Sequence, residues 1–165
     1  MAIPDPIPSD RLESGDFVAD CDADDLVYFL LNVGDGDMQL ILLPADADGT
    51  RRAIVVDVAT VAKLPALVEE LVQAGLIEKR DGLFPVVVGT HPHEDHLGGM
   101  ADFLERYGDF VREYWEPGYY HPGPGYMRTM NALGELPGIQ HSQPTSGFTR
   151  FVGKVKLVVL APAIG

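Results

Sequence analysis

The spacing of apolar and polar positions along the chain predicts a mixed α/β protein. Apolar runs of strand length recur, and turns rich in glycine, proline and aspartate separate them. We predict strands over residues 26–33, 38–43, 52–58, 85–90, 110–115 and 155–162. The fourth of these contains three consecutive valines at 86–88, which is typical of a strand that is buried on both faces of a sheet.

Three segments have the periodicity of helices instead. The first begins near Pro65 and ends near Gly75, and its apolar residues recur at helical spacing. These residues are Leu64, Leu67, Val68, Leu71 and Val72. Further helices are predicted at 100–107, with Gly108 as the stop, and at 126–136. We therefore expect helices that pack on a sheet with their apolar stripes in the core.

The chain divides into a short leader and one domain. Residues 1–24 are rich in proline and then in acids, so we expect an acidic, extended leader. Residues 25–165 have the apolar content of a folded domain. Within it, the Asp-Gly pairs in 34–37 and 46–49 predict tight turns between the first three strands.

The sequence also bears on the compartment. The longest apolar runs, such as 26–31, are far shorter than a membrane-spanning helix. The N-terminus has neither the basic patch nor the apolar stretch of a secretory signal. The single cysteine, Cys21, cannot form a disulfide within the chain and fits a reducing compartment. We therefore expect a cytoplasmic protein that does not associate with membranes.

The net charge of -13 comes from 25 acidic and 12 basic residues. Proteins that bind the phosphate backbone tightly use lysine and arginine to displace counterions, and this sequence has no obvious basic stripe. The acidity therefore argues mildly against tight binding of duplex nucleic acid. It does not exclude a phosphodiester substrate, because bound metal ions would supply local positive charge.

Histidines concentrate in one short segment. The chain has five, and three of them lie in the stretch His-Pro-His-Glu-Asp-His at 91–96, directly after the predicted strand at 85–90. Pro92 has no N–H to donate and disfavours a helix at the residue before it. The strand should therefore end there and open into a loop, and Gly98 and Gly99 should let that loop pack closely before the next helix.

The spacing within this segment suits two metal ions. Side chains two positions apart in extended backbone point the same way, so His91 and His93 can hold one ion. Asp95 and His96 follow where the chain turns, and they can reach a second ion beside the first. Imidazole and carboxylate together suit zinc, and also iron or manganese. A solvated loop residue is the alternative for any one histidine, but the cluster has little structural purpose without a metal.

A segment rich in proline, glycine and tyrosine follows the predicted strand at 110–115. Loops at the ends of strands commonly meet the substrate, so Tyr119, Tyr120 or His121 would line a substrate cleft. His121 would alternatively add a ligand to the first metal. We favour a third interpretation, a rigid surface loop with packed aromatic rings. His141 lies in a polar stretch and is predicted to be solvated.

Three segments resemble the metallo-β-lactamase superfamily. The stretch Thr90-His-Pro-His-Glu-Asp-His-Leu-Gly-Gly99 matches its His-x-His-x-Asp-His signature at every specified position. Phe29-Leu-Leu-Asn-Val-Gly-Asp-Gly-Asp37 resembles the Val-Gly-x-Gly-Asp hairpin of the branch related to the competence protein ComEC. Ala53-Ile-Val-Val-Asp57 is similar to the strand, ending in aspartate, that supports the metal site. The order and spacing of the segments fit as well.

The resemblance implies a four-layer αβ/βα sandwich of two similar halves, with two metal ions at the edge between them. His91 and His93 would bind the first ion, and Asp95 and His96 would bind the second. Asp57 would support the site by orienting one of these ligand residues. Complete members also carry a later bridging aspartate and a late histidine, often in a His-His-Gly-Ser stretch that this sequence lacks. We therefore expect the domain to be the N-terminal half of the fold, with the second half supplied by missing residues or by another chain.

The resulting hypothesis is a metal-dependent hydrolase that uses a zinc-bound hydroxide, with two zinc ions per complete domain, or manganese or iron in their place. Asp95 would hold the second ion and accept a proton during turnover. The ComEC-like hairpin favours a phosphodiester or nucleic acid as the substrate. The alternatives are a small-molecule hydrolase of esters, lactones or lactams, a redox enzyme with iron in the same loop, and a non-catalytic module whose site is incomplete.

Overall fold

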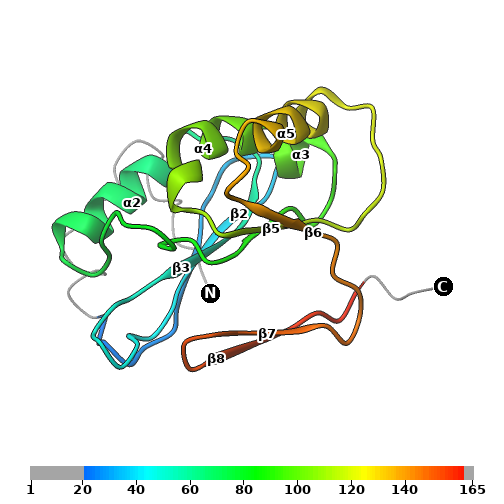
Figure 1. Cartoon of the computed structure of the whole chain (residues 1–165). Helices are drawn as coiled ribbons and strands as arrows, with labels where there is room; N and C mark the ends of the chain where they lie inside the picture. Colours follow the sequence, from blue (N-terminus) through cyan, green and yellow to red (C-terminus); the bar gives the residue numbers. More distant parts are fainter. Residues whose placement is uncertain (1–20, 162–165) are drawn as a thin grey trace, which may run out of the picture.

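A six-stranded mixed sheet forms the centre of the protein (Figure 1). The structure is a computed structural model that describes residues 21–161, so most of the predicted leader lies outside the described residues. The strands are β1 (Val27–Leu30), β2 (Met38–Leu42), β3 (Ala53–Val58), β4 (Val87–Val88), β5 (Glu113–Trp115) and β6 (Gln140–Ser142), in that spatial order. β1, β2 and β3 pair antiparallel, whereas β3, β4, β5 and β6 pair parallel.

Helices cover one face of this sheet (Figure 1). They are α2 (Leu64–Gln73), α3 (Glu94–Leu97), α4 (Met100–Tyr107), the 3-10 turn η1 (Gly108–Phe110) and α5 (Pro124–Gly134). The crossover from β3 to β4 contains α2, and the crossover from β5 to β6 contains α5. Helical crossovers are what parallel strands require, because a short turn cannot return the chain to the same end of the sheet. The predicted α/β class is confirmed.

The main core lies between the helices and the sheet. α2 contributes Leu64, Leu67, Val68 and Leu71, which are the buried members of its predicted apolar stripe. α4 contributes Phe103 and Tyr107, whose rings meet Phe84 edge to face with centroids 5.4 and 5.8 Å away. Burying one such side chain contributes roughly 1.5–3 kcal/mol. These contacts hold α4 against the sheet and thereby fix the segment that precedes it, residues 91–99.

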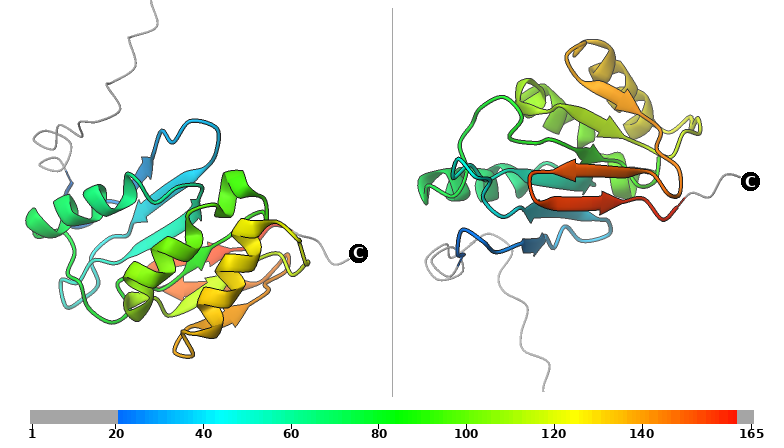
Figure 2. Two further views of the ribbon diagram at one scale, coloured as in Figure 1. Left: turned by 90° about the horizontal axis from the view of Figure 1, so that it is seen from above. Right: turned by 60° about the horizontal axis from the view of Figure 1, so that its bottom comes forward.

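A β-hairpin covers part of the other face (Figure 2). Its strands are β7 (Thr149–Val152) and β8 (Val155–Val158), and its Val152 packs on Leu43, Ile54, Val86 and Trp115 of the central sheet. The hairpin does not reach β1, where Tyr28 and Leu30 remain 52% and 70% exposed. The described residues thus form a mixed sheet with a helical layer on one face and a two-stranded sheet on part of the other.

The described end of the predicted leader is fastened to the domain by a buried arginine. Arg51 donates from Nε to the carbonyl of Leu43 at 3.0 Å, and its terminal nitrogens donate to the carbonyls of Asp22 (3.0 Å) and Asp25 (2.9 Å). Arg51 is 6% exposed, so these bonds satisfy a guanidinium that would otherwise be buried at high cost.

The elements differ from the sequence prediction mainly at their ends. The helix predicted at 100–107 is α4 with the same bounds, whereas α5 begins two residues before its predicted start, at Pro124, because proline suits the first turn of a helix. The strand predicted at 85–90 pairs regularly only as β4, and 110–115 begins with η1. β6 and β7 were not predicted, since both are short and mostly exposed. Within residues 21–161, no helix has the length and apolar character needed to cross a membrane.

Candidate metal centre

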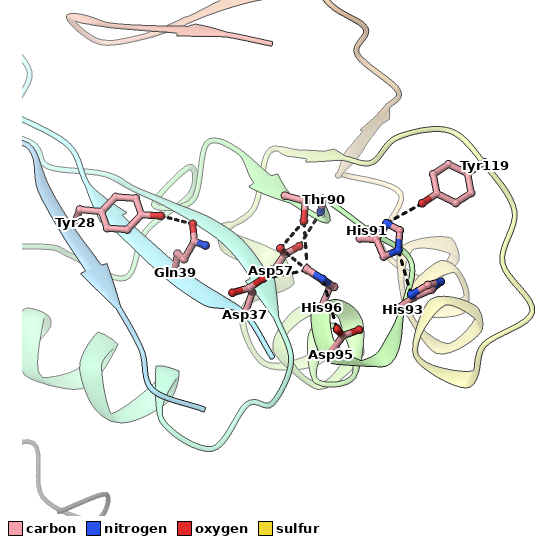
Figure 3. A network of polar contacts seen from close by, with 10 residues as sticks. All are labelled: Tyr28, Asp37, Gln39, Asp57, Thr90, His91, His93, Asp95, His96 and Tyr119. Atoms are coloured by element: carbon pink, nitrogen blue, oxygen red, sulfur yellow. Dashed lines mark hydrogen bonds and ion pairs between the residues drawn. The ribbon is translucent and has the colours of Figure 1, made fainter. Parts of the chain in front are cut away.

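The candidate site lies at the carboxyl ends of the parallel strands (Figure 3). β3 brings Asp57 there, and the segment after β4 brings Thr90 and His91. α3 then carries Asp95 and His96 on a single helical turn, where the sequence predicted only a loop. Loops at this edge of an α/β sheet converge on one place, which is why residues far apart in the sequence meet here.

Asp57 is the buried carboxylate of the site, with 2% of its surface exposed. Its Oδ1 accepts a hydrogen bond from the Thr90 amide at 2.7 Å, and its Oδ2 accepts one from the Thr90 hydroxyl at 2.5 Å. The same Oδ2 lies 2.9 Å from Nδ1 of His96. The φ angle of Asp57 is 55°, a left-handed conformation that is uncommon outside glycine and that these bonds hold in place.

The contact with Asp57 defines how His96 can bind a cation. When Nδ1 donates its proton to the carboxylate, Nε2 is left with a lone pair that is free to coordinate. Nε2 is also the atom nearest to Asp95, whose Oδ2 is 3.7 Å away. Burial by itself would lower the pKa of His96, but the hydrogen bond and charge of Asp57, together with Asp95 and Asp37, outweigh it and raise that pKa.

Asp37 belongs to this cluster, and the sequence analysis did not assign it to the site. Its Oδ2 lies 3.6 Å from Nδ1 of His96, and ligand atoms of Asp37, Asp57 and His96 all lie within 4.8 Å of one another. The Asp37 amide donates to the carbonyl of Asp95 at 2.9 Å, and its carbonyl accepts from the Ala59 amide at 3.1 Å. The backbone of the loop between β1 and β2 therefore binds to the segment at residues 91–99, which we call the metal segment.

Gly36 makes this docking geometrically feasible. A Cβ at this position would lie 2.6 Å from Cβ of Ala59 and 2.7 Å from the Asp95 carbonyl oxygen, and its φ is 150°. The signal in the sequence was the Gly-Asp pair that ends the hairpin motif. Local sequence predicts only a turn at that pair, because the distance between the hairpin and residues 91–96 depends on the tertiary fold.

His91 and His93 form a second group beside the first. Their nitrogens, Nε2 and Nδ1 respectively, lie 3.0 Å apart, as expected for two residues that point the same way. The His91 ring lies 5.4 Å from the His96 ring, centroid to centroid, so the two groups are neighbours. Burial, followed by the charges of the neighbouring histidines His93 and His96, lowers the pKa of His91 and so favours the neutral ring that a metal requires.

The aromatic loop after β5 reaches this second group through two of its three candidate residues. The Tyr119 hydroxyl lies 2.9 Å from Nδ1 of His91, and the His121 ring lies 4.7 Å from the His93 ring, centroid to centroid. His121 accepts a hydrogen bond from the Gly123 amide at Nδ1, which places the proton of its neutral ring on Nε2. Tyr120 is 71% exposed and packs on Tyr126 instead of on the histidines.

Glu94, inside the histidine segment, has a structural role that the sequence analysis also missed. Its Oε1 accepts a hydrogen bond from the Gly125 amide in the first turn of α5. A carboxylate at a helix N-terminus satisfies an unpaired N–H and opposes the positive end of the helix dipole. Arg128 of α5 donates in turn to the carbonyl of Gly98 at 2.7 Å. Together these two contacts tie α5 to the metal segment.

The donors of the two groups fit a pair of transition-metal ions. Neutral imidazole and carboxylate are the usual ligands of zinc, iron and manganese, and a buried carboxylate behind a ligand histidine is the usual support. Two adjacent groups of this kind can hold two ions side by side.

Comparison with known proteins identifies the family of this chain. Residues 46–160 match the family described as the Metallo-beta-lactamase superfamily, and this range includes the whole histidine segment. No curated protein matches the chain. Among solved structures, the chain is similar to the crystal structure of a Beta-lactamase domain protein from Burkholderia ambifaria, at 18% identity and a TM-score of 0.45, over 81% of this chain and 46% of that one. The chain thus spans less than half the length of that protein. The family match covers most of the sequence, and the chain belongs to the metallo-β-lactamase superfamily.

Proposed function

We propose that this chain carries the metal-binding part of a metal-dependent hydrolase. The observation that carries the proposal is the cluster of Asp37, Asp57 and His96 beside His91 and His93, in a chain of a superfamily that is generally hydrolytic. We propose further that the second half of the fold comes from residues outside this sequence or from another chain.

The residues divide into two ligand groups and a supporting shell. We assign His91 and His93 to one ion, and Asp95 and His96 to the other. Asp37 lies beside Asp57 on the Nδ1 side of His96 and adds negative charge there. When bound, the ions would supply Lewis acidity and lower the pKa of a water ligand towards neutrality. Asp95, whose Oδ2 lies 3.7 Å from Nε2 of His96, would hold the second ion and accept a proton during turnover.

The remaining residues orient these ligands. Asp57 fixes the ring of His96 and is itself fixed by two bonds from Thr90. The Tyr119 hydroxyl contacts His91 at Nδ1, which leaves Nε2, the nitrogen beside His93, for a cation. His91 and His96 thus each have Nδ1 in a contact with a neighbouring side chain, which leaves Nε2 for a cation.

Metal content tests the proposal most directly. We expect two equivalents of zinc per chain by inductively coupled plasma mass spectrometry after dialysis against zinc, with manganese or iron as the alternatives to compare. His93→Ala should reduce the zinc content without changing the circular dichroism spectrum, because His93 is exposed. A single equivalent that brief EDTA treatment removes would instead favour a non-catalytic module.

The substrate class is a separate question. The resemblance to the ComEC-like branch supports a phosphodiester or nucleic acid, and the zinc- or manganese-loaded protein should then cleave bis-nitrophenyl phosphate or single-stranded DNA. A panel of nitrophenyl esters and a lactone tests the small-molecule alternative with the same samples. Activity on neither panel, with both metals bound, would contradict the hydrolase proposal.

A further inference from the structure

Glu116, which directly follows β5, is a buried carboxylate outside the two ligand groups. Only 4% of its surface is exposed, and its backbone amide donates to the carbonyl of Ser142 at 3.1 Å, next to β6. Its Oε1 accepts a hydrogen bond from the side-chain amide of Gln143 at 2.6 Å and lies 3.4 Å from Nε2 of His141. Because a buried carboxylate is costly without such partners, these contacts hold Glu116 in one place.

The other oxygen of Glu116 holds the loop that follows. Oε2 accepts a hydrogen bond from the Gly118 amide at 2.9 Å. The φ angle of Gly118 is 85°, so the chain turns there in a conformation that favours glycine. Within the described part of the chain, none of residues 117–122 forms a backbone–backbone hydrogen bond. The bond from Gly118 to Glu116 is therefore the polar contact that fixes the backbone just before Tyr119.

Tyr119 connects this loop to the metal centre (Figure 3). Its hydroxyl lies 2.9 Å from Nδ1 of His91, and Nε2 of the same ring lies 3.0 Å from Nδ1 of His93. Tyr119 is 45% exposed, so much of its ring is free of packing contacts. The backbone before it therefore decides where the hydroxyl lies, and that backbone is held by Glu116.

We propose that Glu116 is a positioning residue of the metal centre and that Tyr119 transmits its effect to His91. The inference rests on the proposed function, in which His91 and His93 hold one ion. Such an ion binds more tightly when the ring of His91 is already held in one orientation, because less side-chain freedom is then lost on binding.

Zinc titration against a chromophoric chelator tests this series of contacts. Tyr119→Phe removes the hydroxyl and should weaken binding of the ion assigned to His91 and His93 about ten-fold. Glu116→Gln places an N–H group opposite one of the donors that the carboxylate now accepts from, so it should weaken the same ion about three-fold or more. The double variant should bind zinc no more weakly than Tyr119→Phe alone, because both changes act on one contact. Effects that multiply would contradict action through Tyr119.

Glu113→Gln is the matched control. Glu113 begins β5, at the end of the strand away from the metal centre, and is 5% exposed. It accepts a hydrogen bond from the indole of Trp115 at 2.9 Å and pairs with Arg150. This variant should lower the melting temperature and leave zinc affinity unchanged. Equal losses of affinity in Glu113→Gln and Glu116→Gln would show a general loss of stability and overturn the proposal.

A second variant loosens Glu116 without burying a new group. Gln143 is exposed, and Gln143→Ala removes one of the donors to Oε1 of Glu116. It should also weaken zinc binding at His91 and His93, and it replaces Glu116→Gln in the comparison if that protein does not fold. Zinc affinity that Gln143→Ala and Glu116→Gln both leave unchanged would contradict the positioning role.

A measurement on the metal-free protein separates this proposal from the hydrolase. In EDTA, the magnetic resonance signals of the ring nitrogens of His91 should shift in Glu116→Gln towards their values in Tyr119→Phe, and Glu113→Gln should leave them unchanged. That result in a protein that binds no zinc would support the positioning role and contradict the proposed function. Zinc binding with ring signals and affinity that Glu116→Gln leaves unchanged would overturn the positioning role and leave the proposed function standing.

Discussion

Asp57 is the residue on which the geometry of the centre most depends. It joins β3 to the metal segment through Thr90 and His96, and its own backbone is held in a left-handed conformation. Asp57 is buried, and its two oxygens accept hydrogen bonds from Thr90 and contact His96 from fixed directions. A change that keeps the shape of this side chain but removes its charge therefore isolates its electrostatic role.

We predict that Asp57→Asn weakens binding of the metal ion assigned to Asp95 and His96 about ten- to a hundred-fold. An amide nitrogen would face either Nδ1–H of His96 or a donor of Thr90, so the ring of His96 would lose its support. Competition with a chromophoric zinc chelator measures the affinity. Asp109→Asn, an exposed change on η1, is the matched control. Equal affinities for the two variants would contradict the orienting role.

His96 makes the stability of the metal-free protein depend on pH. The pKa of His96 is higher in the folded protein than the value of about 6.5 in the unfolded chain. The contacts that raise it therefore stabilise the fold fully at pH values below the unfolded pKa. This stabilisation is lost as the pH rises through the folded pKa. We predict that the melting temperature of the metal-free protein exceeds that of His96→Gln by more at about pH 5.5 than at about pH 9. Differential scanning fluorimetry in EDTA measures both, and a difference that grows with pH would refute the assignment.

The sequence predicts the site residues that lie close together in the chain, but not those that are distant from them in the chain. His91, His93, Asp95 and His96 are close in the chain, so local geometry alone brings them together. Asp37 is more than fifty positions away, and its place depends on how the β1–β2 loop docks. Glu94 was overlooked for a similar reason, since its partner is the first turn of a helix that follows another strand.

At the scale of elements, the β1–β2 loop is the part whose docking can be tested most cleanly. Gly34 and Gly36 both have positive φ angles, but only Gly36 lies against Ala59 and Asp95. A Cβ at Gly34 would have no atom within 4 Å. Substitution of Gly34 therefore measures backbone strain alone. Substitution of Gly36 adds the effect of displacing the loop from the metal segment.

We predict that Gly36→Ala lowers the melting temperature more than Gly34→Ala does and, unlike it, weakens zinc binding. Strain at either glycine costs on the order of 1 kcal/mol. The clash at Gly36 adds to that cost and breaks the bond from the Asp37 amide to Asp95. Thermal unfolding and zinc titration of the two proteins give the comparison. If both variants bound zinc equally well, Asp37 would have no part in the site.

Elements with a strong apolar pattern were predicted and those without one were not. α2 and α4 have buried stripes at helical spacing, β2 buries alternate apolar residues, and β3 buries most of its residues. β6 is the tripeptide Gln140–Ser142, which no pattern of burial marks, and it is a strand only because β5 offers it a parallel partner. The sequence could not supply that partner, since parallel pairing is a property of the whole sheet.

At the scale of the whole molecule, negative charge is concentrated at the metal centre, where several carboxylates lie close together. The chain has a net charge of -13, and three carboxylates, those of Asp37, Asp57 and Asp95, surround His96. Without a cation these groups repel one another, and the positive charge of a protonated His96 offsets that repulsion. A bound divalent ion would remove that repulsion and join β3, α3 and the β1–β2 loop through one point.

We therefore predict that zinc raises the melting temperature and that EDTA reverses the rise. Free zinc at about a hundred times its dissociation constant would add roughly 2.7 kcal/mol to the free energy of unfolding. For a chain of this size that corresponds to an increase of about 5–10 °C. At a pH where His96 is neutral, Asp37→Asn should reduce the increase while raising the melting temperature of the metal-free protein, because it relieves repulsion that a neutral imidazole does not offset. A variant that lowered the metal-free melting temperature and kept the full zinc response would show that Asp37 stabilises the loop without meeting the ion.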